Sequence, residues 1–430
     1  MFSGGLSPHR RAPHASQARD TLLVALFVGA AFAILLQPHV ASLSQFGVQA
    51  TLDHLYGSTV YPRVVIAVNY FEDGFIRRGL PGTLLSGLDA DPRLQVFSFI
   101  VLSAVCVAIP LGLLSLRLLH ELPLRVSAYL IAIVLIAPPL FPLWAGDYAR
   151  TDLLIEGLLA WSVIAALTNR RWLAIALVLF GLLAHETAYI FGAPLLLALF
   201  HHDARSGLIQ KRQALILALG VLLGAPVILS LQALLSSPPG AVAARLLSEF
   251  PISPDDEQNR LFRDNAIYMA IGGKAALRSA LCFNFEIDPR HAVTGGFCIA
   301  VLALYAVILP LWMRPGPLVG AVFAPAFFML VIALDTGRWL GMGVLNAWLL
   351  TAFFTLRGQL AMLYDRRWLA VSTLLMVGVF LMGPTTVAHV NRVVKKLTYD
   401  GHPYPFEVTI KSWMEHCDPR WQAVVYGPGR

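Results

Sequence analysis

Long apolar stretches separated by short charged segments are the feature that most restricts what this chain can fold into. Hydrophobic residues make up 57% of its 430 residues and charged residues only 13%, about half the charged share of a soluble domain. A chain this apolar has too little polar surface to cover a globule in water. The composition therefore predicts an integral membrane protein, and it excludes a soluble enzyme, a disordered protein and a disulfide-rich secreted scaffold.

Eleven stretches are apolar enough to be interpreted as transmembrane helices, because about 20 residues rising 1.5 Å each cross a bilayer. Two of them are short and flank His185-Glu186, which indicates a tight hairpin. The predicted fold is an all-α polytopic membrane protein. The stretches are about 21–37, 95–116, 126–144, 153–168, 173–184, 187–200, 213–236, 296–313, 317–334, 339–356 and 368–388.

The distribution of charge predicts the orientation of these helices. Six short segments (1–20, 117–125, 169–172, 201–212, 314–316 and 357–367) hold 14 Lys and Arg against four acidic residues. The predicted outer segments hold the other 18 Lys and Arg against 19 acidic residues, and the last two acidic residues, Glu156 and Glu186, lie at membrane depth. Short basic loops lie on the cytoplasmic side, so we predict a cytoplasmic N-terminus and a periplasmic C-terminus. The net charge of +7 is then a topology signal, and no nucleic-acid partner is predicted.

This topology divides the chain into three parts. Residues 1–20 form a cytoplasmic N-terminus, residues 21–388 form the transmembrane domain with outer loops 38–94 and 237–295, and residues 389–430 form a short periplasmic tail. The apolar run from Thr21 is predicted to be a retained helix rather than a cleaved signal peptide. Amphipathic stretches at Gln45–Leu55 and Ala241–Phe250 predict interfacial helices in the outer loops.

The chain has four cysteines. Cys106 lies within a predicted helix and is expected to be inert packing. The other three fall on the predicted outer side, where an oxidising compartment permits a disulfide. The sequence predicts one disulfide, formed either by Cys282 and Cys298 or by Cys282 and Cys417.

The first outer loop carries the densest polar cluster, between Asn69 and Gly82. Glu72 and Asp73 are followed by Arg77 and Arg78. A carboxylate can accept a proton from a hydroxyl nucleophile, and an arginine can bind a phosphate through two hydrogen bonds. The alternative is a loop tied together by an internal Asp–Arg pair.

A second cluster lies between the third and fourth predicted helices, where Asp147 and Asp152 bracket Arg150. These side chains could bind a substrate, or they could be solvated, with Asp152 starting the next helix. Glu156 lies one helical turn after Asp152 and could share its face.

Two more clusters fall at the predicted outer face. His185 and Glu186 at the hairpin tip could bind an anion or relay a proton, or simply form a satisfied polar turn. The histidine that a zinc-protease motif requires four residues later is replaced by a tyrosine. Asp335, Arg338 and Trp339 suit a phosphate or lipid headgroup, or an ordinary interfacial anchor.

Three of these features together resemble the polytopic GT-C glycosyltransferase superfamily. They are an acidic residue in the first outer loop, a short hairpin with the sequence Gly181-Leu-Leu-Ala-His-Glu-Thr-Ala followed by Pro194-Leu-Leu-Leu, and an outer Asp-x-x-Arg-Trp. As topology, the resemblance covers most of the chain. It implies an inverting transfer of a sugar from a polyprenyl-phosphate or polyprenyl-diphosphate donor to a glycan, lipid or protein acceptor. The active site would face the periplasm from a bacterial inner (plasma) membrane.

The resemblance also implies roles for the polar residues. Asp73 is the first candidate for the catalytic base and Glu72 the second. No cofactor is predicted, and the spacing gives no support for a divalent metal shared by Asp73 and Asp147. The donor phosphate would be bound by Arg77, Arg78, Arg338 and His185, and the substrate by Asp147, Arg150, Asp152, Glu186, Asp335 and Trp339.

Two alternatives stay open. A lipid-linked polysaccharide polymerase belongs to the same class of enzyme. A transporter or flippase for a lipid-linked or anionic substrate would use Glu156, His185 and Glu186 as a path through the membrane. Its usual signature is a pair of pseudo-symmetric halves with broken helices at midplane, and neither is visible in the sequence.

Overall fold

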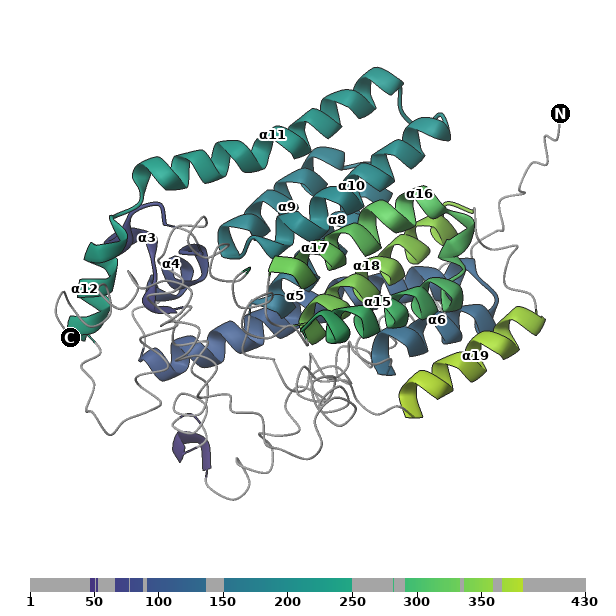
Figure 1. Cartoon of the computed structure of the whole chain (residues 1–430), viewed down its shortest axis with the longest axis horizontal. Helices are drawn as coiled ribbons and strands as arrows, with labels where there is room; N and C mark the ends of the chain where they lie inside the picture. The colour runs from purple at the N-terminus through teal and green to yellow at the C-terminus, as the bar shows by residue number, and fades with distance from the viewer. Residues whose placement is uncertain are drawn as a thin grey trace, which may run out of the picture.

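The computed structural model describes residues 47–50, 52, 66–76, 78–87, 91–136, 151–249, 281, 291–332, 336–358 and 366–381. Within these ranges the chain forms a bundle of helices and contains no strand (Figure 1). The main elements are α3 (Tyr70–Asp73), α4 (Leu80–Ser86), α5 (Pro92–Glu121), α6 (Leu124–Ile136), α8 (Asp152–Leu167), α9 (Arg171–Ala184), α10 (Thr187–Arg205), α11 (Lys211–Leu235), α12 (Pro239–Glu249), α15 (His291–Ile308), η2 (Leu311–Met313), α16 (Pro315–Leu318), the π-helix η3 (Val319–Phe323), α17 (Ala324–Ile332), α18 (Thr336–Leu356) and α19 (Arg366–Leu381).

The starts of α5 and α8 follow from local sequence. The Asp91 side chain accepts a hydrogen bond of 2.8 Å from the backbone amide of Arg93, and Pro92 occupies the first helical position, where its missing N–H removes no helical hydrogen bond. Helix α8 begins at Asp152, whose negative charge suits the positive end of the helix dipole. Of the two interpretations of this cluster, the one in which Asp152 starts a helix agrees with the structure, but its carboxylate is buried rather than solvated.

Three described helical segments are long and apolar enough to cross a bilayer: α5, α11 and the part of α18 from Arg338 to Leu356. Shorter apolar helices cover Arg171–Ala184, Cys298–Ile308 and Pro315–Val331. Described helices overlie ten of the eleven predicted stretches, wholly or in part, and 21–37 lies outside the described residues. These findings support a membrane protein, whereas the count of eleven spans and their orientation stay predictions.

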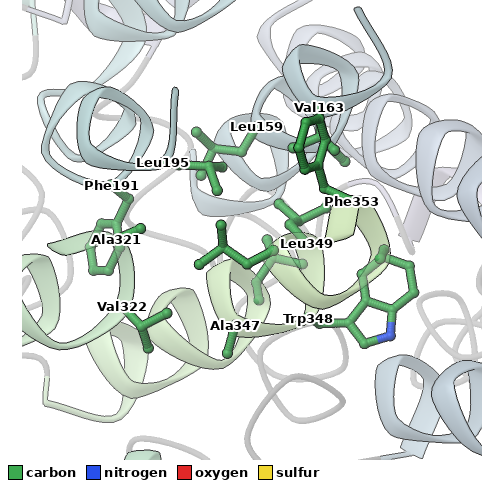
Figure 2. Packing of buried hydrophobic residues seen from close by; sticks show 14 of the residues in the cluster. Leu159, Val163, Phe191, Leu195, Ala321, Val322, Ala347, Trp348, Leu349 and Phe353 are labelled. Atoms are coloured by element: carbon green, nitrogen blue, oxygen red, sulfur yellow. The ribbon is translucent and has the colours of Figure 1, made fainter. Parts of the chain in front are cut away.

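Helices α18 and α11 show two kinds of apolar helix. Helix α18 is central: Trp348 and Phe353 are fully buried, and the Trp348 indole donates a hydrogen bond of 2.8 Å to the Leu130 carbonyl of α6. Figure 2 shows side chains of α8, α10, η3 and α18 packed in this core. Helix α11 lies along the edge of the bundle (Figure 1) and exposes apolar side chains such as Leu223 and Leu234. An apolar face of this length suits contact with lipid.

Gly157 permits the close crossing of α8 and α5. A Cβ atom at this position would meet the backbone carbonyl of Cys106, and a backbone group cannot turn aside as a flexible side chain can. We expect Gly157→Ala to force the helices apart and to lower the free energy of unfolding by about 1–3 kcal/mol, the usual cost of overpacking. The melting temperature in detergent measures this effect.

Gly296→Ala is the matched control, because a Cβ at Gly296 meets no atom within 4 Å. It is expected to leave the melting temperature unchanged or to raise it slightly, since alanine favours a helix over glycine. Equal melting temperatures for the two variants would contradict the close α5–α8 crossing.

The bundle has two ends, which we name after an aspartate at each. At the Asp73 end, α8 and α18 begin and α9 gives way to α10. At the Asp203 end, α8, α10 and α18 finish and α9 begins. At the Asp73 end, the Asp152–Arg338 ion pair joins the starts of α8 and α18. At the Asp203 end, Arg171 at the start of α9 and Arg357 just after α18 both lie beside Asp203 of α10.

The Asp203 end is held by an ionic cluster. Arg171 contacts Asp203 at 2.6 Å, and Arg357 lies 3.6 Å from it. Burial alone would raise the pKa of Asp203, but His202, Arg171 and Arg357 together hold that pKa below its ordinary value. The carboxylate is thus kept ionised by the two arginines beside it.

This depressed pKa predicts a pH-dependent contribution to stability. Because the folded pKa lies below the unfolded one, the contribution is fully present above about pH 4 and is lost as the pH falls through the folded pKa. We expect wild type to melt at a higher temperature than Asp203→Asn at pH 7, with a difference that shrinks below about pH 4. A difference independent of pH would show that the ionised carboxylate does not stabilise the fold.

Two predictions made from the sequence can be compared here. The amphipathic stretch Ala241–Phe250 is helical, since α12 covers Pro239–Glu249, whereas most of Gln45–Leu55 lies outside the described residues. Cys298 is fully buried within α15, but Cys282 lies outside the described residues, so the Cys282–Cys298 pairing stays a prediction. The alternative Cys282–Cys417 lies outside the described residues.

Candidate functional site

The first outer loop is folded tightly against the end of α11. The Asn69 side chain caps α3 by accepting hydrogen bonds of 3.0 Å from the amides of Phe71 and Glu72. The chain then turns at Gly74, whose φ of +68° is readily adopted only by glycine. After this turn, the amide of Phe75 donates to the Leu235 carbonyl at 3.1 Å. The backbone thereby fixes where Glu72 and Asp73 lie.

Arg245 of α12 binds both acidic residues of this loop. Its Nε and one terminal nitrogen donate to the two oxygens of Asp73 at 3.0 and 2.7 Å. Its other terminal nitrogen lies 2.8 Å from Glu72, and the Ala67 carbonyl accepts a further hydrogen bond of 2.8 Å. The Asp73 side chain is 1% exposed, whereas that of Glu72 is 49% exposed. Glu72 is therefore the carboxylate that another molecule can reach.

Arg245 was not identified from the sequence, although a local signal for it exists. Val242 and Leu246 of α12 are buried and belong to one apolar cluster with residues of α4, α5, α8 and α9. Arg245 stands three residues after Val242, so it shares the helix face of that residue. A charged residue on the apolar face of an amphipathic helix is a candidate for a buried ion pair.

Arg78 joins the loop to the hairpin tip. Its Nε donates to Glu186 at 2.9 Å, and both side chains are mostly shielded from solvent. Its φ of +62° is a left-handed conformation, which costs a non-glycine residue roughly 1–2 kcal/mol. Such strained residues cluster at functional sites, and here the conformation accompanies the contact with Glu186.

His185 acts in the structure as a cap for α10. Its Nδ1 accepts a hydrogen bond of 3.2 Å from the Thr187 amide, and the Thr187 hydroxyl lies 3.0 Å from the same nitrogen. A nitrogen that accepts from an amide carries no proton, which places the imidazole proton on Nε2. The contacts of Nδ1 therefore agree with the interpretation of His185 as part of a satisfied polar turn.

Asp152 and Arg338 form a buried pair between the starts of α8 and α18. The guanidinium donates to both carboxylate oxygens, at 2.7 and 2.6 Å, and it lies 4.8 Å from the centre of the Trp339 ring. All three side chains are buried. Glu156, one turn further along α8, is fully buried as well.

Tyr70 ties the loop to the hairpin as a neutral hydrogen-bond donor. Burial raises the pKa of its hydroxyl to about 12, although the nearby Gln232 side chain acts in the opposite direction. The hydroxyl donates to the Leu183 carbonyl near the end of α9 at 3.5 Å. It is therefore protonated at neutral pH and positions the loop rather than transferring a proton.

The Asp73 end thus gathers acidic and basic side chains from segments far apart in the sequence. A shared apolar cluster of residues from α4, α5, α8, α9 and α12 packs beneath the loop. Glu72, Asp73, Arg78, Asp152, His185, Glu186, Arg338 and Trp339 are placed at this end, mostly within ion pairs. The remaining candidates Arg77, Asp147, Arg150 and Asp335 lie outside the described residues.

This arrangement combines groups able to accept a proton, bind an anion and pack against an apolar molecule. The half-exposed Glu72 lies beside an arginine, and two further arginines, Arg78 and Arg338, occupy the same end. No protein-family model, curated protein or solved structure matches this chain.

Proposed function

We propose that the protein is a membrane glycosyltransferase that takes a sugar from a polyprenyl-phosphate or polyprenyl-diphosphate carrier. The observation that carries this proposal is the clamp of Arg245 on Glu72 and Asp73. It leaves Glu72 half exposed while Asp73 is buried. A carboxylate held in place by an arginine and open to a second molecule suits a general base.

In the proposed reaction, Glu72 accepts the proton of an acceptor hydroxyl. The hydroxyl oxygen forms a bond to the anomeric carbon as the bond from that carbon to the carrier phosphate breaks. The electron pair leaves with the phosphate, and the configuration of the sugar inverts. Asp73 holds Arg245, which in turn keeps the carboxylate of Glu72 in position.

Arginines would neutralise the charge that develops on the leaving phosphate. Arg78, which lies beside the hairpin tip, is the candidate among the described residues that best suits this role. Arg338 is bound through two hydrogen bonds to the buried Asp152, which favours a positioning role for it. Arg77 keeps its predicted role as a phosphate ligand.

We further propose that the Asp73 end faces the periplasm, across a bacterial inner membrane. The positive-inside rule places basic residues in the cytoplasm. Arg171, Arg205, Arg314 and Arg357 belong to the described segments at the Asp203 end. This distribution supports a cytoplasmic Asp203 end, and hence an outward position for Glu72.

The test is deletion of the gene followed by mass spectrometry of the lipid extract. The expected result is loss of one surface glycan, lipid or protein modification together with accumulation of a lipid-linked sugar, reversed by the wild-type gene. A single accumulated sugar indicates a transferase, and an accumulated oligosaccharide repeat indicates a polymerase. An unchanged lipid extract would overturn the proposal, and uptake by proteoliposomes that requires Glu156 but not Glu72 would establish a transporter instead.

A further inference from the structure

A cavity of about 710 Å³ lies at the Asp203 end, far along the bundle from the site described above. Its walls come from the last turns of α10, the segment from Met313 to Gly320, and Phe354 of α18. Figure 1 shows α16 beside α10 and α18 in the same part of the bundle. A volume of this size lies within the range of small-ligand sites, and the proposed transfer reaction makes no use of it.

The charged lining of the cavity is basic. Arg205 ends α10 and is exposed, Arg314 precedes α16 and is partly buried, and His201 is exposed beside them. The lining among the described residues includes no acidic side chain. The nearby Asp203 is already bound to Arg171 at 2.6 Å, so it does not neutralise these cations. The charge of the cavity therefore favours an anion.

A buried histidine adds an independent polar group. His202 lines the cavity and is only 6% exposed, packed against the rings of Phe353 and Phe354. Neither of its ring nitrogens has a hydrogen-bond partner among the described residues, and Nδ1 lies 3.8 Å from Asp203, beyond hydrogen-bonding distance. Buried polar groups are normally satisfied, so among the residues that line the cavity His202 has hydrogen-bonding capacity left over.

The remaining wall is apolar and lies where a bilayer surface would meet the bundle. Leu197, Met313 and Pro317 line the cavity; Met313 is 45% exposed, and the adjacent Trp312 is 55% exposed. Exposed Trp side chains are typical of the interface between hydrocarbon and water. The wall also includes Gly320 of the π-helix η3, and π-helical turns occur frequently at functional sites.

We propose that this cavity binds the phosphate headgroup of an anionic membrane lipid, with Arg205 and Arg314 contacting the phosphate and the apolar wall contacting the chain. The basic rim accounts for the anion and the apolar wall for the lipid. The site is separate from the proposed transfer site and does not depend on it. Under the proposed orientation it opens toward the cytoplasmic leaflet.

The test titrates fluorescent phosphatidylglycerol into the full chain in a neutral detergent. The double variant Arg205→Gln/Arg314→Gln is expected to bind about 30-fold more weakly, since each basic residue near a membrane surface contributes roughly fivefold. His202→Phe keeps the aromatic packing, removes the ring nitrogens and is expected to weaken binding as well. Melting temperatures verify that each variant is folded, and the single variant Arg314→Gln replaces the double one if that fails.

The control is Lys211→Gln/Arg212→Gln, an exposed basic pair at the start of α11 that does not line the cavity. Weaker binding in the cavity variants with wild-type binding in this control supports the proposal. Equal losses in both pairs would show attraction to any basic surface and overturn it. Competition by inorganic phosphate at the same concentration as the lipid would show a free-phosphate site, and unchanged binding in the cavity variants would reject the site altogether.

Discussion

Replacing Glu72 by glutamine is expected to lower the rate of sugar transfer by about 10²- to 10⁴-fold, the contribution of a single general base. The amide cannot take up a proton, but its oxygen can still accept hydrogen bonds from Arg245 and Asn69, which both contact Glu72. The fold and the binding of the donor should therefore be retained. The measurement is turnover of the purified protein with the lipid-linked sugar that accumulates after gene deletion.

Asp91→Asn is the matched control, because Asp91 is another exposed carboxylate and caps α5. Asparagine caps a helix as well as aspartate does, so this variant should turn over like wild type. Asp73→Asn tests the other acidic residue: it weakens the contact with Arg245 and should lower both melting temperature and activity. If Asp73→Asn alone abolished transfer at an unchanged melting temperature, Asp73 would be the base. Wild-type rates in both Glu72→Gln and Asp73→Asn would reject the proposed mechanism.

Arg338→Ala is expected to lower the free energy of unfolding by about 3–5 kcal/mol, because it leaves Asp152 as an uncompensated buried charge. Asp152 and Arg338 are both nearly inaccessible to solvent and share two short hydrogen bonds. The loss is measured as a shift of the unfolding transition in detergent. An unchanged transition would contradict the buried ion pair.

The double variant Asp152→Leu/Arg338→Met separates stability from function. Replacing a buried ion pair by apolar side chains of similar size is often neutral or stabilising, so this variant should unfold close to wild type. If it also transfers sugar at the wild-type rate, the pair serves only to hold α8 against α18. A folded but inactive double variant would give Arg338 a direct role at the donor phosphate.

Local sequence signals predicted the helices well. The apolar stretches indicated helices where α5, α8, α9, α10, α11 and α18 are found, and the amphipathic spacing at Ala241–Phe250 indicated α12. The short hairpin around His185-Glu186 corresponds to the turn between α9 and α10. These features depend on residues close in the chain, which is why composition and spacing are sufficient to predict them.

The partners of the charged residues could not be predicted in the same way. One of the two interpretations of the first outer loop was an internal Asp–Arg pair, whereas the structure pairs Asp73 with Arg245, 172 residues away. Likewise, Asp152 and Arg338 are 186 residues apart. The sequence placed them in two separate polar clusters and did not indicate that they pair. Hydropathy locates a helix but does not specify which helix packs beside it.

The sequence by itself therefore determined that this is an apolar, helical chain whose acidic and basic residues gather in the segments between helices. Only the tertiary structure decided that Glu72 is open while Asp73 is covered, and that His202 lines a basic cavity at the opposite end. The physical reason is that these helices are apolar on every side, so their periodicity does not distinguish a face toward lipid from a face toward protein. Burial and ion pairing arise when distant helices pack, and that packing is a property of the whole bundle.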